Sequence, residues 1–149
     1  MTSHRTTIDK ALQLDSQLCF ALYSASLAMT KLYAPLLAEL GLTYPQYLAM
    51  LVLWERDGLM VSELGERLFL DSGTLTPLLK RLEAAGLIAR IRALDDERRV
   101  HVTLTAAGRK LKGRAVRIPA CIAGAVQMPL ADIGSLTRQV QALRQRLTA

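Results

Sequence analysis

The sequence predicts a mainly α-helical fold with one small β-hairpin, and three observations support this. Leucine and alanine recur at helical spacing over most of the 149 residues, aromatic residues make up only 5% of the chain, and one short region alternates with period two. An apolar share of 51% over this length is enough for a domain with a real core and argues against disorder.

The N-terminal part predicts two helices. From about Ile8 to Leu40 the apolar residues lie at helical spacing on more than one face, so we expect a long helix that is buried on several sides and ends at Gly41. A second helix begins at Thr43-Tyr44-Pro45, with the proline in its first turn, and runs to Asp57.

Two short helices joined by a tight turn follow, which is the pattern of a helix-turn-helix. We expect Ser62 to cap the helix SELGERLF, the segment LDSG to form the turn, and Gly86 to close the helix TLTPLLKRLEAAG. Pro77 argues against full regularity in this last helix. Its buried stripe is expected to consist of Leu75, Leu78, Leu79 and Leu82.

The period-two region predicts a β-hairpin directly after this pair of helices. In LIARIR the residues Leu87, Ala89 and Ile91 share one face, and in RVHVTLT the residues Val100, Val102 and Leu104 do so. The polar segment ALDDER forms the tip. Helix, turn, helix and hairpin together predict a winged helix-turn-helix over residues 44–105.

The remaining segments predict a dimerisation layer. Thr105 caps a helical stretch that Pro119 interrupts, and a final helix follows Pro129. Residues 1–43 and 106–149 are too apolar for the small winged domain to cover, so we expect them to join two chains in a homodimer. A heptad-like seam in the final helix supports this; it consists of Leu130, Ile133, Leu136, Val140, Leu143 and Leu147.

Charge and cysteine usage restrict the class of protein. The net charge is +6, with eight basic residues and one acidic residue in positions 105–149. This favours a polyanionic partner, and solubility alone is the other explanation for the charge. No apolar stretch reaches the ~20 residues of a membrane span and no secretion signal is evident, so we expect a cytoplasmic protein without a membrane partner. Two distant cysteines, two histidines and no CxxC spacing predict free thiols, no metal and no cofactor.

The winged helix-turn-helix pattern predicts binding to double-stranded DNA. We expect the polar face of the second helix to enter a major groove, and the hairpin tip to reach the flanking minor groove or backbone. Asp96 is expected to orient Arg98. The predicted DNA-binding residues are Ser72, Gly73, Thr76, Pro77, Lys80, Arg90, Arg92, Asp96, Arg98 and Arg99.

A basic cluster behind the hairpin has two interpretations. It either extends the contacts to phosphate or is an ordinary solvated face. The cluster consists of Arg109, Lys110, Lys112, Arg114 and Arg117.

Cys19, in the apolar stretch QLCFALYSAS, is the candidate reactive residue. A free cysteine is often inert core filling. Four tyrosines lie in or beside the same helical layer, and a phenol that donates a hydrogen bond favours the thiolate, the form that attacks peroxides. They are Tyr23, Tyr33, Tyr44 and Tyr47, and simple interface packing is the other explanation for them.

Four segments together resemble the MarR family of winged-helix repressors, specifically its organic-hydroperoxide-sensing (OhrR-like) branch. They are QLCFALYSAS, YAPLLAELGLTYPQYLAMLVLWE, LDSGTLTPLLKRLEAAGLI and DDERRVHVTLT, and they extend over nearly the whole chain. The resemblance implies that Cys19 is the peroxidatic cysteine and that Tyr33 and Tyr44 hydrogen-bond its sulfur across the dimer. It also implies a resolving role for Cys121 of the partner subunit, as in two-cysteine members of the branch.

Helix geometry agrees with an arrangement across the dimer. Cys19 and Tyr33 are 14 residues apart, or about 21 Å along one straight helix, so they cannot touch within one chain. They can meet if the first helices of two subunits run antiparallel.

The sequence therefore predicts a redox-sensing repressor, not an enzyme. It binds operator DNA when reduced and is released when organic hydroperoxide oxidises Cys19. One alternative is a MarR-type repressor released by a small aromatic ligand, with Cys19 structural. A thiol peroxidase is the other, and the absence of a dedicated acid/base constellation argues against it.

Overall fold

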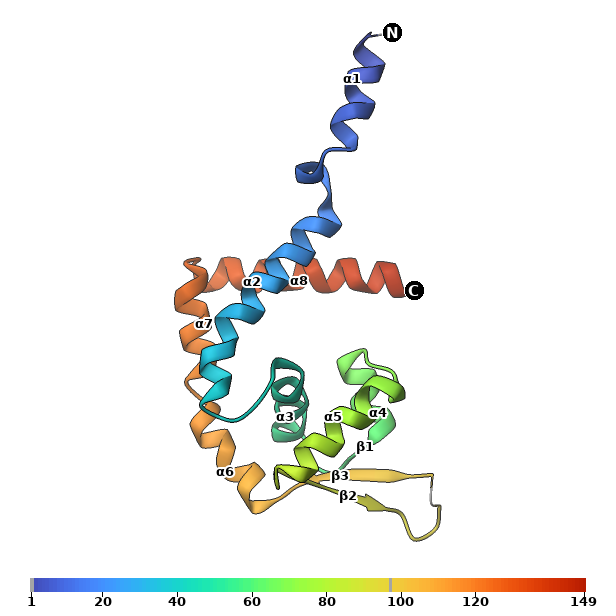
Figure 1. The fold of residues 1–149 in the computed structure, drawn as a ribbon, viewed down its shortest axis with the longest axis vertical. Helices are drawn as coiled ribbons and strands as arrows, with labels where there is room; N and C mark the ends of the chain where they lie inside the picture. The colour runs from blue at the N-terminus through green and yellow to red at the C-terminus, as the bar shows by residue number, and fades with distance from the viewer. Residues whose placement is uncertain (1, 97) are drawn as a thin grey trace. The chain divides into compact units, whose positions relative to one another are not determined.

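The computed structural model describes residues 2–96 and 98–149, and it confirms the predicted fold class (Figure 1). The chain separates into two compact units, one ending at Leu48 and the other beginning at Ala49. The elements in chain order are α1 (Thr2–Ala11), the 3-10 turn η1 (Leu14–Ser16), α2 (Leu18–Ala38), α3 (Tyr44–Glu55), β1 (Leu59–Met60), α4 (Val61–Leu68), α5 (Ser72–Ala84), β2 (Ile88–Arg92), β3 (Val100–Leu104), α6 (Ala106–Ala115), α7 (Ile118–Val126) and α8 (Leu130–Thr148).

The predicted single helix from Ile8 to Leu40 is wrong, because the structure divides it. Helix α1 ends at Ala11, and Gln17 donates its side-chain amide to the carbonyl oxygens of Ala11 at 2.7 Å and Gln13 at 2.9 Å. These bonds satisfy carbonyls that a continuing helix would have bonded itself. The leucine spacing runs through the break, so periodicity alone could not reveal it.

Helix α2 ends where glycine was predicted to end it. Gly41 has a φ of 70°, a left-handed conformation that glycine adopts without strain, and the Leu42 N–H donates to the Leu37 carbonyl at 3.0 Å. Leu37 is the one buried residue of α2. The apolar character of this helix is therefore largely left on the surface.

The predicted helix-turn-helix is present as α4 and α5, with two differences at the helix starts. Helix α4 begins at Val61, and the Glu63 carboxylate accepts from the Met60 N–H at 3.2 Å, so Ser62 is not the cap. Helix α5 begins at Ser72, where the Asp71 side chain accepts from the Thr74 N–H at 2.8 Å.

The stripe predicted to be buried in α5 is buried: Leu75, Leu78, Leu79 and Leu82. Pro77 lies within this helix. It removes the donor for the carbonyl of Gly73, and Gly73 is exposed, so water can satisfy that carbonyl. Gly86, with a φ of 77°, ends the helix, and Leu87 N–H bonds back to the Leu82 carbonyl at 3.1 Å.

The hairpin is part of a three-stranded antiparallel sheet with the order β1-β3-β2, in which Leu59 pairs with Val102 and Ile88 with Leu104. The short strand β1 was not predicted. Leu87 and Ala89, on the face expected to be apolar, are half-buried, and Ile91 on that face is 55% exposed, whereas Ile88 on the opposite face is 2% exposed. Arg90 therefore shares the inner face with Ile88.

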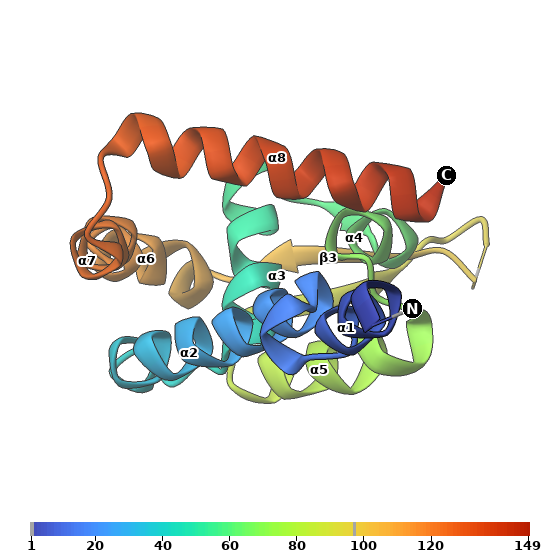
Figure 2. The same ribbon diagram turned by 90° about the horizontal axis from the view of Figure 1, so that it is seen from above.

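The C-terminal elements begin as predicted. The Thr105 hydroxyl accepts from the Gly108 N–H at 3.1 Å, and the Trp54 indole N–H donates to the Gly108 carbonyl at 2.9 Å. Pro119 lies in the first turn of α7. Helix α8 then turns away by 95° (Figure 2). No single described helix is long and apolar enough to cross a membrane, although the bent pair formed by residues 106–126 and 130–148 meets the length and composition criteria together.

We expect Gly108→Ala to lower the free energy of unfolding by about 1–3 kcal/mol, the usual effect of overpacking. A Cβ at this position would overlap the backbone carbonyl of Leu87. Gly113→Ala in the same helix is the matched control, because a Cβ there meets nothing within 4 Å and alanine favours a helix by about 1 kcal/mol. Urea unfolding measures both variants, and equal effects of the two would contradict the assignment.

Candidate nucleic-acid interface and thiol site

The side of α5 opposite its leucines carries the polar residues predicted to meet DNA. Ser72, Gly73, Pro77 and Lys80 are exposed, and Thr76 is half-buried. Asp71 holds the start of this helix, and the hydrogen bond from the Thr74 backbone N–H lowers the pKa of its carboxyl. The cap therefore stays anionic and bonded at neutral pH.

A groove of about 670 Å³ separates α4 and the start of α5 from the end of the hairpin. It brings together three predicted DNA-binding residues from two elements: Ser72, Arg98 and Arg99. The contribution of α4 to this groove could not be predicted from the sequence, because amphipathic periodicity does not show which polar residues face a neighbouring element. The other lining residues are Met60, Val61, Ser62, Gly65, Glu66, Phe69, Leu70, Leu75 and Val100.

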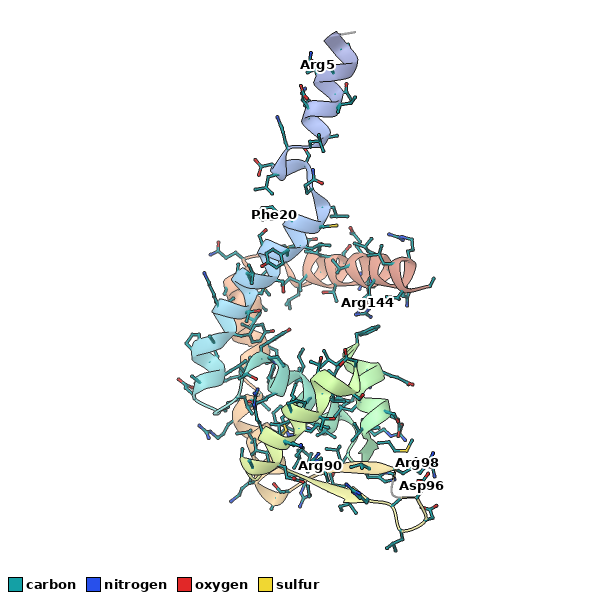
Figure 3. All side chains as sticks on the ribbon, turned by 45° about the vertical axis from the view of Figure 1, so that its right-hand side comes forward. Arg5, Phe20, Arg90, Asp96, Arg98 and Arg144 are labelled. Carbon is teal, nitrogen blue, oxygen red and sulfur yellow. The ribbon has the colours of Figure 1, made fainter. Side chains whose placement is uncertain are left out.

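At the hairpin tip, Asp96 organises the turn through the backbone. Its carboxylate accepts from the Arg98 N–H at 3.0 Å, and its carbonyl accepts from the Arg99 N–H at 3.0 Å. Asp96 therefore contacts Arg98 through the backbone amide of Arg98, and its predicted role in orienting the Arg98 side chain stays a prediction. Both residues lie at the tip in Figure 3, with Arg90 further back along the hairpin. Arg92, at the end of β2, is exposed.

Arg90 is engaged within the protein. Glu83, near the end of α5, accepts from the Arg90 backbone N–H at 3.0 Å and from its guanidinium at 3.2 Å. These bonds, led by the one from the Arg90 side chain, hold the pKa of Glu83 below its usual value. The Nε of Arg90 is buried and has no hydrogen-bond partner among the described residues. Arg90 therefore links α5, the second helix of the helix-turn-helix and its recognition helix, to the hairpin. Its predicted contact with DNA stays a prediction.

The basic cluster on and beyond α6 is partly engaged. Arg109 donates to the Leu104 carbonyl at 2.9 Å, whereas Lys110 and Lys112 are exposed. The hydrogen bond from Arg109 links α6 to the end of β3.

Both cysteines are free and exposed. Cys19 lies in the first turn of α2, and Cys121 lies in α7 between the buried residues Ile118 and Ile122. The two thiols belong to different compact units. Each is accessible to a reagent from solution, in contrast to a buried structural cysteine.

Three tyrosines form a cluster within the N-terminal unit. The ring centroid of Tyr33 in α2 lies 4.9 Å from that of Tyr44 and 5.9 Å from that of Tyr47, both at the start of α3. The rings are tilted relative to one another, a favourable arrangement for aromatic pairs. The structure thus brings together the two predicted tyrosines and adds Tyr47, which the sequence analysis noted without giving it a role.

The cluster keeps its phenols protonated. Burial, followed by the neighbouring Tyr44 and Tyr47, raises the pKa of Tyr33 to about 12, and burial also raises the pKa of Tyr44 and of Tyr47. Protonated phenols are hydrogen-bond donors. No group of three metal-ligating side chains gathers in the described part of the chain.

A helix-turn-helix followed by a basic hairpin, with its polar face outward, defines a winged-helix DNA-binding protein. Residues 31–114 match the family model described as transcriptional regulator SarA/Rot. The chain belongs to the MarR family of winged-helix transcriptional regulators, on the branch of the organic hydroperoxide resistance regulators.

Individual relatives support this assignment. The chain is 51% identical to the HTH-type transcriptional regulator TtmR of Methylorubrum extorquens, over 97% of this chain and 74% of the relative. It is 50% identical to the organic hydroperoxide resistance transcriptional regulator of Bacillus subtilis, over 91% and 92%.

Solved structures of AbfR, a Staphylococcus epidermidis protein, have the same fold. The reduced form bound to DNA matches with a TM-score of 0.78 and 31% identity, over 95% of this chain and 99% of that one. The disulfide form matches with a TM-score of 0.63 and 32% identity, over 97% and 96%.

We expect Tyr33 to ionise last among the clustered tyrosines, because its pKa is raised from 10.0 to about 12. A raised pKa favours the neutral phenol in the folded state, so its contribution to stability is complete below pH 10 and is lost as the pH rises through about 12. Tyrosinate absorbance of wild type minus that of Tyr33→Phe measures this ionisation. A difference that titrates near pH 10 would contradict the burial of Tyr33.

Proposed function

We propose that this protein is a redox-sensing repressor that binds operator DNA while Cys19 is reduced and leaves it when an organic hydroperoxide oxidises Cys19. The observation that carries this proposal is an exposed thiol at one end of an apolar helix and a cluster of protonated tyrosines near the other end. The relationship to a Bacillus organic hydroperoxide resistance regulator supports the choice of inducer.

The DNA-facing surface combines the exposed polar side of α5 with the arginines of the hairpin. In this proposal Ser72, Gly73, Thr76 and Pro77 face base edges in the major groove, and Lys80 neutralises a phosphate. Arg92, Arg98 and Arg99 reach the neighbouring minor groove or backbone. Arg90 and Asp96 support this surface without contacting DNA. Arg90 fixes the hairpin to α5 through Glu83, and Asp96 shapes the hairpin tip.

A homodimer supplies the cover that the apolar helices lack. Helix α8 has no buried residue, and α2 has one. Large exposed apolar patches mark interaction surfaces. We propose residues 1–43 and 106–149 as the dimerisation segments on either side of the DNA-binding segment 44–105. The exposed apolar side chains are Ile8, Leu12, Leu14, Leu18, Phe20, Tyr23, Leu27 and Met29 in the N-terminal segment, and Val116, Leu130, Leu136, Val140 and Leu147 in the C-terminal one.

Antiparallel pairing of two α2 helices would complete the thiol site. Cys19 and Tyr33 both lie in α2, about 21 Å apart along its axis, so a pair centred near Ser26 places each thiol opposite the partner's tyrosines. Ser26 lies on the same face of α2 as Cys19 and Tyr33, and its small side chain permits a close approach of the two helices at this centre. Hydrogen bonds from Tyr33 and Tyr44 of the partner subunit would stabilise an anionic sulfur.

The oxidation then proceeds in two balanced steps. The Cys19 thiolate attacks the terminal oxygen of the hydroperoxide, the O–O bond breaks, a proton is taken up, and the alcohol leaves, which converts the thiolate to sulfenic acid. Condensation with the thiol of Cys121 of the partner subunit forms an S–S bond and releases water. The hydroperoxide is reduced by two electrons, and the two thiols supply them.

The apolar surroundings of Cys19 favour organic over inorganic peroxides. Phe20 and Leu22 lie within one turn of Cys19 and leave apolar surface accessible there. Met29 is about 15 Å further along α2, and antiparallel pairing would bring Met29 of the partner subunit closer to the thiol. An alkyl tail gains about 25 cal/mol for each Å² that it buries there, and hydrogen peroxide has no such tail. We therefore propose alkyl and lipid hydroperoxides as the preferred oxidants.

Closing a disulfide requires movement. The Cα atoms of two bridged cysteines lie within about 7 Å, so Cys121 must approach the partner's α2. We propose that this movement starts in α7, which has Pro119 in its first turn, and that it reorients the two DNA-binding segments and destroys the half-site spacing on DNA.

We expect Cys19→Ser to bind DNA as tightly as wild type and to lose the response to cumene hydroperoxide completely. The thiolate is the trigger in this proposal and does not touch DNA. Fluorescence anisotropy on a duplex selected from a random pool with the wild-type protein measures both properties. Release of the variant at the wild-type oxidant dose would overturn the redox assignment and favour a repressor controlled by a small aromatic ligand.

We expect brief oxidation to convert wild type, but neither Cys19→Ser nor Cys121→Ser, to a covalent dimer that a reductant reverses. A sulfenic acid beside a second thiol is short-lived, so the disulfide forms before further oxidation. A non-reducing gel with peptide mass mapping identifies the bridge. A wild type that stays monomeric on this gel, while Cys19 gains an added small thiol, would show that Cys121 takes no part.

A further inference from the structure

Phe69, the residue that ends α4, has a backbone conformation that disfavours its side chain. Its φ is 57°, in the left-handed region, where glycine is the residue without a steric penalty. The Leu70 N–H donates to the Gly65 carbonyl at 3.0 Å, so this is a regular left-handed helix end. Glycine at position 69 would form the same turn with less strain.

The same turn does use glycine where space requires it. A Cβ at Gly65 would lie 2.9 Å from the carbonyl oxygen of Leu70, closer than side-chain carbons approach. The chain thus has glycine at 65, where space is short, and an aromatic ring at 69, where the backbone favours glycine. A strained residue that persists indicates a requirement for its side chain.

The contact of the Phe69 ring identifies that requirement. The guanidinium carbon of Arg144, in α8, lies 4.1 Å from the ring centroid, well within the range of a cation–π interaction. The C-terminal half of α8 passes α4 in both ribbon views, and Arg144 projects from α8 in Figure 3. This contact connects α8 directly to the helix-turn-helix. Helix α8 has no buried residue, so it is not held there by a buried apolar side chain.

Phe69 is placed to influence DNA reading without touching base edges. It begins the turn that leads through Leu70 to Asp71, the cap of α5. It also lines the groove that contains Ser72 and Arg98. The backbone conformation of Phe69 therefore helps to set where α5 begins.

We propose that Arg144 and Phe69 are positioning residues, and that their cation–π contact is the connection through which the C-terminal helix sets the recognition helix for DNA binding. This inference rests on the proposed DNA-binding function. The contact requires the cation to lie within about 6 Å of the ring centroid, so a displacement of α8 by one helical turn breaks it. Loss of the contact frees the turn and lowers the affinity for DNA.

The test compares Arg144→Ala, Phe69→Leu and the double variant on a duplex selected from a random pool with wild-type protein. We expect each single variant to weaken binding about two- to fivefold, the equivalent of one exposed cation–π contact, and the double variant to be no weaker than the weaker single one. Arg144→Lys should recover part of the loss because it retains a cation. Arg146→Ala is the control, since it removes the same charge from the same helix.

The salt dependence of binding distinguishes positioning from a direct contact. A positioning role leaves the slope of log K against log salt unchanged in Arg144→Ala, whereas loss of a phosphate contact reduces it by about one. Thermal unfolding and sedimentation establish that each variant keeps its fold and association state. A reduced slope, additive losses in the double variant, or equal losses in Arg146→Ala would overturn the inference. A wild-type protein that selects no duplex would instead overturn the proposed function on which it rests.

Discussion

Burial of one row of leucines in α5 is the constraint on which the DNA-binding surface depends. With Leu75, Leu78 and Leu79 in the core, helical geometry forces the residues between them outward, whatever their chemistry. Asp71 fixes where the helix begins, and Gly86 fixes where it ends. The polar side of α5 is therefore set by the packing of its apolar side. The point where α5 ends also fixes where β2, the first strand of the hairpin, begins.

The second determinant is the surface that a single chain leaves uncovered. Helix α2 carries a thiol, a row of apolar side chains and one member of the tyrosine cluster, yet little of it is buried. An exposed helix with so much apolar surface is typical of an interaction surface. In the proposed dimer, association and thiol chemistry would use the same helix, and a substitution in α2 that serves one would affect the other.

Much of this could be predicted from the sequence, because hydrophobic period and helix-ending residues are local signals. The leucine row, the Gly41 and Gly86 ends, the Thr105 cap and the hairpin all followed from short stretches of residues. The break before α2 did not, because a glutamine side chain makes it while the leucine spacing continues. The exposure of Ile91 was also not predicted. Both faces of β2 carry apolar residues, and only the pairing with β3 determines which face is buried.

The same distinction applies to the site. Residue type and position were enough to select Cys19 and the arginines of the hairpin as candidates, whereas Tyr33 was selected from four tyrosines by the resemblance to a known family. What Arg90 does depends on Glu83, seven positions earlier and on another element, and nothing in the local pattern announces that pair. Contacts between elements, such as the ring of Phe69 under Arg144, lie outside the reach of periodicity for the same reason.

The 14 residues between Cys19 and Tyr33 on one rigid helix have a further consequence. In the proposed dimer every sensing centre is shared, with the sulfur from one subunit and the phenols from the other. Dilution into monomers would then abolish detection of the oxidant and recognition of a two-fold operator together. In that case a newly made chain would be insensitive to oxidant until it met its partner, and sensing and repression would begin together.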